Sequence, residues 1–446
     1  MTSSASSVAS TTLPVPAARR LPWGLIVFGL GLSTGLAMML VGLRVDAADD
    51  PYLYGFIGQS LANGDGFPHQ PIQRRGPLYP LLIGLLYLIF GVHVWIVHLA
   101  QAVMFGATAW LVYDMGRRLF ASQRAAIIAG VACALNPLLL RYVATLHCEA
   151  FLIFLFTLMV WQTVRFRERP TVLNGVLVGA AAGLTCLVKA VALVYPAVFA
   201  ALLALELFRA NRQRALAAIP WVPLALMFVS MAAVISPWTI RNYKVLGHFV
   251  PVSTGTSDAV LRSFIFSRTE FITLREPPYT GAENDSNDLF KALAKEAGTE
   301  WQKDEWETEQ ILNKAAKKKV LAEPGAFVRK TVVGVFTFWY QMTSLKNSLV
   351  VGVSALFAWV FAIIGWRRAR GEGRKVWMVL APALYLNILL ALLLALGRYS
   401  APVVPGVLVV AGYGVDTLLS RFGIGRSGAA ALRNRQPQPS APGAGA

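Results

Sequence analysis

The sequence has few charged residues and almost no cysteine. Only 14% of its 446 residues are Asp, Glu, Lys or Arg, and three are cysteine. A soluble domain carries about 25% charged residues, so this composition excludes an ordinary soluble enzyme. Three cysteines cannot form a disulfide framework, and no CxxC or Cys/His cluster predicts a zinc site.

The sequence also lacks the motifs that bind nucleotide phosphates. It has no GxxxxGK[ST] segment, which argues against an ATP-driven pump. Gly29, Gly31 and Gly35 form a GxGxxxG run, but they lie within an apolar stretch, where glycines let helices pack closely. The net charge of +18 does not predict a nucleic-acid partner, because about half of the basic residues flank apolar runs, where they mark membrane topology.

Apolar residues make up 56% of the chain and recur in long uninterrupted runs. A run of about 20 residues matches a bilayer core of about 30 Å, so the sequence predicts an all-α polytopic integral membrane protein with about 10 spans, in a range of 10–13. The expected spans are 22–43, 95–116, 125–142, 149–165, 171–188, 191–208, 216–237, 347–366, 376–396 and 400–420.

Basic clusters between these runs predict which ends face the cytoplasm. They give a disordered cytoplasmic tail at 1–20, a membrane module at 21–237 and a long extracytoplasmic segment at 238–345. C-terminal spans at 346–420 and a disordered cytoplasmic tail at 421–446 follow. The high Ala, Gly and Arg content favours a bacterial source, hence the bacterial inner membrane, and the outer segments then lie on its periplasmic side.

Two apolar stretches are shorter than a span. Residues 77–91 would cover about 22 Å as a helix, which predicts a helix at the outer interface or entering partway. A full span there is the alternative. Residues 328–343 are aromatic and short, which also suits an interfacial helix.

The first outer loop, 44–76, is rich in acids at its start. Acids beside a membrane are costly unless they are paired or solvated, so they are functional candidates; a solvated loop start is the alternative. Residues at helical spacing follow them and predict a short amphipathic helix closed by glycine. The acids are Asp46, Asp49 and Asp50, and the spaced residues are Tyr54, Gly58, Leu61 and Gly64.

Further charged residues are expected at the same outer rim. Glu149 lies at the mouth of a span beside His147, although an acid there also satisfies a helix dipole. Lys189 lies at a break between two spans, where snorkelling is the alternative. A carboxylate serves as a base, and cations hold a phosphate, so the group suits transfer from a lipid phosphate. The other cations are Arg74, Arg75, Arg241 and Arg398.

These residues fall into an ordered set of motifs. Asp50, Tyr54, Gly58, Leu61 and Gly64 come first, followed by RGPLYP at 75–80, PWTIRNY at 237–243 with FVPVST at 249–254, and Arg398-Tyr399 before two prolines. With Glu149 and Lys189 between them, the set resembles the GT-C glycosyltransferases, in particular the bacterial relatives of protein O-mannosyltransferases and of the lipid A aminoarabinose transferase. The resemblance covers roughly residues 20–420.

The resemblance implies a membrane glycosyltransferase that takes a sugar from a polyprenyl phosphate on the outer face and inverts its anomeric carbon. Asp50 would be the base, with Asp49 as its close rival, and Glu149 would orient the acceptor. The implied phosphate ligands are Arg75, Lys189, Arg398 and, as a weaker candidate, Arg241. The implied substrate contacts are Tyr54, Tyr79, His147 and Tyr399.

Several points stay open at this stage. The acceptor is a glycolipid such as lipid A, a cell-envelope glycan or a protein. The segment after Thr254 reads Gly-Thr-Ser-Asp where relatives often have Gly-Gly, and Gly58 stands where alanine is usual. The two adjacent aspartates lack Asp-x-Asp spacing, so no metal or other cofactor is expected to be required. A transporter or flippase of a lipid-linked or anionic substrate is the alternative function, and a non-catalytic assembly or export partner is a third.

Overall fold

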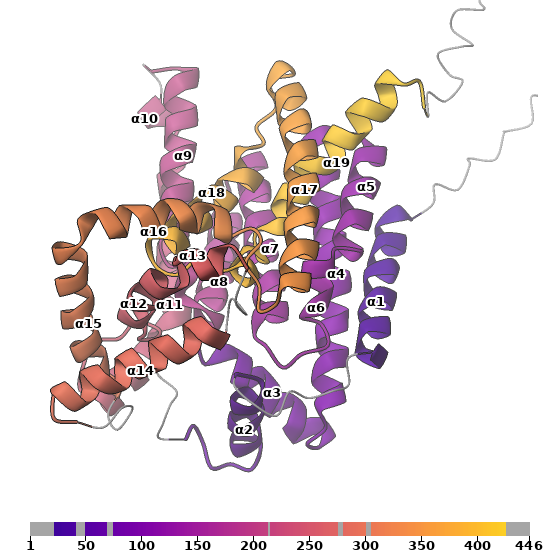
Figure 1. The fold of residues 1–446 in the computed structure, drawn as a ribbon. Helices are drawn as coiled ribbons and strands as arrows, with labels where there is room; N and C mark the ends of the chain where they lie inside the picture. The colour runs from indigo at the N-terminus through magenta and orange to yellow at the C-terminus, as the bar shows by residue number, and fades with distance from the viewer. Residues whose placement is uncertain are drawn as a thin grey trace, which may run out of the picture.

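The computed structural model describes residues 22–41, 50–68, 75–212, 215–274, 280–299 and 305–424. Within these ranges all regular structure is helical (Figure 1). The elements are α1 (Trp23–Val41), α2 (Asp50–Ala62), α3 (Leu78–Phe90), α4 (Val94–Phe120), α5 (Gln123–Ala134), α6 (Pro137–Arg141), α7 (Glu149–Glu168), α8 (Val172–Val188), η1 (Ala190–Ala192), α9 (Tyr195–Ala210), α10 (Ala215–Ala218), α11 (Trp221–Leu246), α12 (Thr256–Phe266), α13 (Thr269–Ile272), α14 (Thr280–Glu296), α15 (Glu305–Ala322), α16 (Pro324–Thr337), α17 (Leu345–Gly371), α18 (Trp377–Leu392), η2 (Gly397–Ser400) and α19 (Val404–Arg421).

Seven helical segments in the described part of the chain are long and apolar enough to cross a membrane: α1, α4, α5 with α6, α7, η1 with α9, α11 and α17. α3, α8 and α18 are apolar but shorter. Each predicted span coincides with one or more helices, and the expected all-α polytopic membrane fold is confirmed. α3 has 13 residues, about 20 Å, which is too short to span and agrees with the interfacial or partial helix expected at 77–91.

For two of the predicted spans, the difference from the observed helices has a clear local cause. The span expected to end at residue 237 continues through Pro237 to Leu246. Proline cannot donate to the carbonyl four residues before it, but the Ser236 hydroxyl donates to that carbonyl, Ala233 O, at 3.0 Å. The span expected at 125–142 is broken into two helices. α5 ends at Ala134, and the Asn136 side chain caps the start of α6.

α8 and α11 pack with their backbones in close contact. A Cβ atom on Gly179 would lie 2.0 Å from the Met227 carbonyl oxygen, and one on Gly175 would lie 2.2 Å from that of Pro223. Glycine at these positions therefore lets the two helices approach. The contact also holds the end of α8, which lies directly before Lys189.

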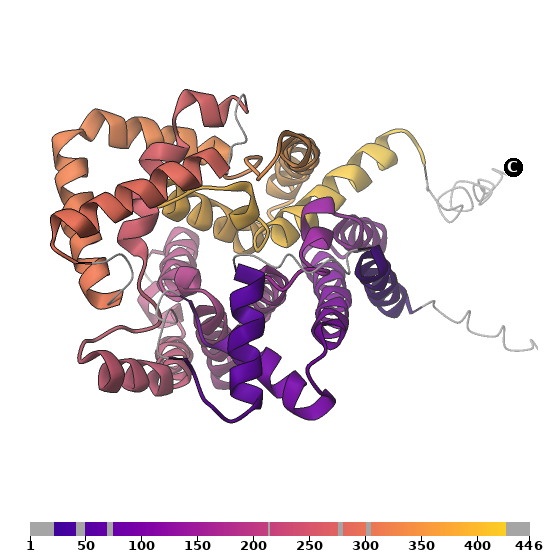
Figure 2. The same cartoon turned by 60° about the horizontal axis from the view of Figure 1, so that its bottom comes forward.

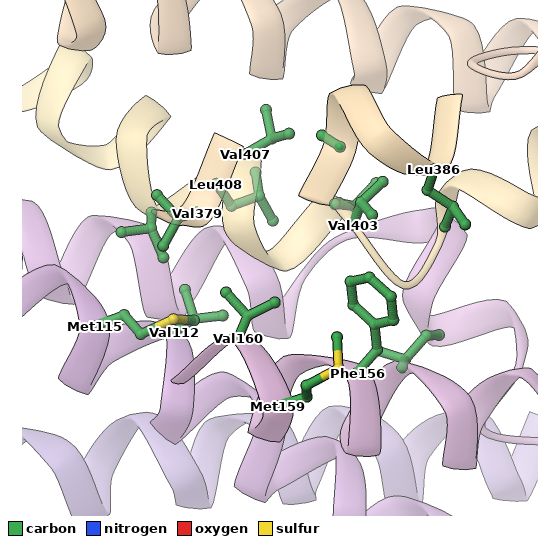
Figure 3. Packing of buried hydrophobic residues seen from close by; sticks show 14 of the residues in the cluster. Val112, Met115, Phe156, Met159, Val160, Val379, Leu386, Val403, Val407 and Leu408 are labelled. Carbon is green, nitrogen blue, oxygen red and sulfur yellow. The ribbon is translucent and has the colours of Figure 1, made fainter. Parts of the chain in front are cut away.

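The main core joins the N-terminal and C-terminal halves of the chain. Figure 3 shows Phe156 and Val160 of α7 on one side and Val403 and Val407 beside them on the other. Phe156 is fully buried and Val407 is 1% exposed. α7 is thereby packed against the start of α19, although the two helices come from opposite halves of the sequence.

Charged and aromatic pairs join the helix ends opposite to α2 and α3, the ends predicted to be cytoplasmic. Arg167 of α7 binds Glu206 of α9 at 2.6 Å, and the Trp377 indole of α18 donates to the same carboxylate at 2.8 Å. After α17, hydrogen bonds from Arg374 and neighbouring groups lower the pKa of Glu372 to about 2. The contacts of Arg167 and Trp377 with Glu206 connect α7, α9 and α18.

α12, α14, α15 and α16 form a lobe on one side of the bundle (Figures 1 and 2). Leu261, Phe290 and Leu312 give α12, α14 and α15 a small core of their own. The Glu309 carboxylate of α15 accepts hydrogen bonds from the backbone N–H groups of Gly255 and Ser257, at 3.0 and 3.3 Å, and so caps α12. The helix expected at 328–343 is present as α16, which begins earlier and ends at Thr337.

The α8–α11 contact makes a first prediction. Gly179→Ala will lower the thermal midpoint of the purified protein in detergent, because overpacking a tight contact costs about 1–3 kcal/mol. Gly29→Ala is the matched control, since a Cβ atom on Gly29 meets nothing within 4 Å. It will leave the midpoint unchanged or raise it. Equal midpoints for the two variants would contradict the proposed packing role.

Candidate active site

Glu149 is a buried carboxylate at the start of α7. Its residue is 3% exposed, and its Oε1 atom lies 3.9 Å from the Nζ atom of Lys189. Lys189 directly follows α8 in an extended conformation, and a new helical turn begins with Ala190. The break between α8 and η1 therefore places the ammonium beside the carboxylate, and the charge of the one offsets the cost of burying the other.

Arg398 and Tyr399 reach the same place from η2, which follows the end of α18. The Lys189 Nζ atom lies 4.2 Å from the centre of the Tyr399 ring. The Arg398 guanidinium lies 4.9 Å from that ring and donates from Nη2 to the Tyr399 hydroxyl at 3.0 Å. The ring thus lies close to two cations and links them.

These groups line one cavity. Its wall contains Glu149, Lys189, Arg398 and Tyr399, and the remaining lining residues are apolar: Leu152, Val191, Leu386, Leu390 and Pro402. One carboxylate and two cations leave a net positive charge at its polar end. Two cations of this kind can hold an anionic group, and the apolar wall begins directly beside them.

The first outer loop packs against this cavity through α2 and α3. Gly58 of α2 lies against Ile83 of α3, where a Cβ atom would come within 2.3 Å of the isoleucine side chain. The Tyr54 ring meets the Tyr79 ring edge-on at 5.0 Å, and the Arg75 guanidinium lies 5.9 Å from the Tyr54 ring centre. Tyr54, Tyr79 and Arg75 therefore form one unit.

Gly76 brings the first loop into contact with the residues directly before Lys189. A Cβ atom there would lie 2.2 Å from the Leu187 carbonyl oxygen and 2.5 Å from that of Val188. The chain after Arg75 consequently runs against the last residues before Lys189. Tyr54 also belongs to the same buried cluster as Cys148 and Val188, the residues directly before Glu149 and Lys189.

Gln101 of α4 connects the loop before Glu149 with α3. It is fully buried and accepts a hydrogen bond from the Tyr79 hydroxyl at 2.8 Å. Its amide nitrogen donates to the Val143 and Thr145 carbonyl oxygens at 2.8 and 3.0 Å. Gln101 is thus a positioning residue for both sides of the site. The sequence contained the signal, an isolated amide in an apolar run, but the interpretation above did not use it.

The Cys148 thiol is a second group that sequence reasoning missed. Its Sγ atom donates to Glu149 Oε2 at 3.8 Å. His147, a predicted substrate contact, turns its ring edge-on toward Tyr142 at 6.1 Å, and its Nδ1 atom is buried without a hydrogen-bond partner among the described residues. His147 adjoins the site in sequence, two residues before Glu149.

Arg241 contacts aromatic residues of α11 and of the first loop. Its guanidinium lies 4.7 Å from the Trp238 ring centre and 5.9 Å from that of Phe67, so it joins α11 to the end of the first loop. The PWTIRNY segment around it holds the following chain: the Trp238 indole donates to Val252 O at 2.9 Å, and the Asn242 amide donates to the same oxygen at 3.2 Å. These contacts give the motif a structural role.

The structure does not describe the side chains of the predicted first-loop acids Asp46, Asp49 and Asp50. Asp46, Asp49 and Arg74 lie outside the described residues, and of Asp50 the structure describes only the backbone, which begins α2. The described residues contain no group of three or more His, Cys, Asp or Glu side chains arranged to hold a metal ion. The role of the first-loop acids therefore stays a prediction.

Comparison with known proteins agrees with the predicted resemblance. Residues 71–240 match the family described as dolichyl-phosphate-mannose-protein mannosyltransferase, a range that includes Arg75, Glu149 and Lys189. No curated protein matches the chain. The oligosaccharyltransferase AglB from Archaeoglobus fulgidus, solved with an inhibitory peptide and a dolichol-phosphate, superposes with a TM-score of 0.55 at 14% identity, covering 94% of this chain and 52% of that one.

ArnT from Cupriavidus metallidurans is also similar. Its complex with undecaprenyl phosphate superposes with a TM-score of 0.41 at 17% identity, covering 93% of this chain and 81% of that one. Its apo state gives 0.38 at 15% identity, covering 90% and 79%. The chain spans about half the length of the archaeal protein, with which it shares its fold.

The Gln101 contacts make the second prediction. Gln101→Met will lower the thermal midpoint and expose Cys148 to maleimide labelling, because each buried polar group left without a partner costs about 1–3 kcal/mol. Gln162→Met is the control, since the Gln162 side-chain oxygen is buried without a partner in the described chain. A Cys148 labelling rate that does not rise in Gln101→Met would rule out the positioning role.

Proposed function

Because the chain has the GT-C membrane fold and carries a dolichyl-phosphate-mannose-protein mannosyltransferase match over residues 71–240, we propose that it is a glycosyltransferase that uses a polyprenyl-phosphate sugar. Transfer takes place at the extracytoplasmic end of the bundle. The acceptor is a hydroxyl or amine on a glycolipid, a cell-envelope glycan or a protein.

One observation supports this proposal above the others: α2, which begins with Asp50, packs against the residues that precede Glu149 and Lys189. A base candidate, a buried carboxylate and three cations thus come from segments that adjoin one another. The third cation is Arg75, whose backbone continues into the Gly76 contact with the Val188 carbonyl.

The roles follow from the chemistry of these groups. The Asp50 carboxylate, or that of Asp49, removes the proton from the acceptor as its oxygen or nitrogen attacks the anomeric carbon. The bond from that carbon to the phosphate oxygen breaks, and its electron pair stays on the polyprenyl phosphate. Lys189, Arg398 and Arg75 stabilise the charge on the departing phosphate. Attack opposite to the leaving group inverts the anomeric carbon.

The remaining predicted residues take supporting roles. Glu149 orients the acceptor and neutralises Lys189 before the donor enters. Tyr399 orients the two cations through its ring and hydroxyl, while Tyr54 and Tyr79 hold the first loop in place. His147 lies one residue before Cys148 and would contact the acceptor. Arg241 holds Phe67 of the first loop in position through its contact with the Phe67 ring.

The third prediction concerns the base. With purified polyprenyl-phosphate sugars in nanodiscs, Asp50→Asn will reduce donor cleavage by about 10²–10⁴-fold, as expected when a general base is lost. Asp65→Asn is the matched control, an exposed acid of the same loop. If Asp49→Asn is the inactive variant and Asp50→Asn is active, the base is Asp49.

Two other outcomes would count against the proposal. Full activity of the double variant would refute a first-loop base. Donor binding without cleavage, in every donor and acceptor combination, would favour a carrier of lipid-linked substrate over an enzyme.

The fourth prediction concerns the cations. Lys189→Met and Arg398→Met will each weaken donor use, measured as kcat/KM, by about tenfold to a hundredfold, the usual loss for a charge-assisted hydrogen bond. Arg268→Gln is the control, because Arg268 is exposed and pairs with Asp285 in the outer lobe. Unchanged kcat/KM in both cavity variants would remove these residues from the phosphate site.

A further inference from the structure

The corner between α15 and α16 joins a basic stripe to an exposed apolar stripe. On α15, Lys314, Lys317 and Lys318 share one exposed face, and Leu321 continues that face with 82% of its surface exposed. Their spacing of three, one and three residues places them on one side of the helix. The opposite side is buried in the lobe through Leu312.

The apolar stripe continues on α16. Val328, Val332 and Phe336 recur every fourth residue and are 61%, 55% and 65% exposed. The other side of α16 is fixed on the outer end of α18. There the buried Lys330 ammonium donates to the Ala391 carbonyl oxygen at 3.1 Å, and a Cβ atom on Gly334 would lie 3.0 Å from the Cα atom of Ala391.

This attachment sets the level of the corner relative to the bilayer. α16 runs alongside the end of α18, and α15 leads away from it with its lysine-bearing C-terminal end nearest α16 (Figure 1). The apolar stripe therefore lies beside the end of the apolar helix α18, and the lysines lie next to it. The nearest carboxylate in sequence, Glu323, is already bound by Lys319 at 2.6 Å.

We propose that this corner binds anionic phospholipid headgroups of the outer leaflet. The apolar stripe of α16 and Leu321 insert among the upper acyl chains, and Lys317 and Lys318 meet the phosphates. An amphipathic surface of this kind binds through buried apolar area together with attraction to anionic lipid. The lipid contact holds the outer lobe, and through it the segment capped by Glu309, at a constant height above the membrane.

The experiment measures which lipid touches the corner of the full-length protein. Leu321→Cys is labelled with an environment-sensitive fluorophore, which reacts selectively because Cys133, Cys148 and Cys186 are buried. The protein is placed in nanodiscs of phosphatidylcholine mixed equally with phosphatidylglycerol, and the nitroxide quencher is carried on one lipid or the other. We expect stronger quenching by nitroxide phosphatidylglycerol, and we expect salt to weaken the preference.

Charge removal tests the assignment to the lysines. Lys317→Gln/Lys318→Gln will reduce the preference for phosphatidylglycerol by about fivefold for each lysine. Lys291→Gln/Lys295→Gln, on exposed positions of α14 in the same lobe, will leave it unchanged. Equal quenching by both lipids in the lysine-bearing protein overturns the proposal. So does the absence of quenching by either, since the face would then meet solvent or another protein.

Discussion

The burial of the Glu149 carboxylate at the start of α7 is the constraint on which the site depends. A carboxylate with 3% exposure beside a membrane needs a cation close by. Lys189 supplies it at 3.9 Å only because α8 ends at Val188 and the chain turns into η1. Arg398 joins them because α18 ends at Leu392 and η2 brings the chain back. The start of α7 and the ends of α8 and α18 therefore have to lie close together.

The rest of the structure holds those helix ends in position. Gln101 fixes the loop that leads into Glu149 and binds the Tyr79 hydroxyl of the first outer loop. Gly76 presses that loop against the residues before Lys189, and the glycines of α8 keep the helix against α11. Side chains without any catalytic chemistry thus determine where the charged groups meet, which is the usual requirement for a preorganised site.

The motif at 237–243 shows how one segment connects the membrane bundle with the outer lobe. α11 passes through Pro237, and Trp238 and Asn242 bind the carbonyl oxygen of Val252. From there the chain enters α12, whose start is capped by Glu309 of α15. The lobe is attached to the bundle through this segment, through the Lys330 contact of α16 with α18, and through a buried cluster that Ile265 and Phe266 of α12 form with Leu394 and Leu396. These attachments set its position relative to the bundle.

The sequence by itself determined the helices and the inventory of charged groups. Long apolar runs predict spans because a bilayer core has one thickness, and glycine after a helical pattern predicted the end of α2. It did not predict that α11 continues through Pro237, where the Ser236 hydroxyl donates to the carbonyl oxygen that the proline cannot reach. Nor did it show which outer cations meet. Lys189 and Arg398 converge on Tyr399, whereas Arg241 stacks on Trp238, because the packing of helices from distant parts of the sequence, and not local pattern, sets these distances.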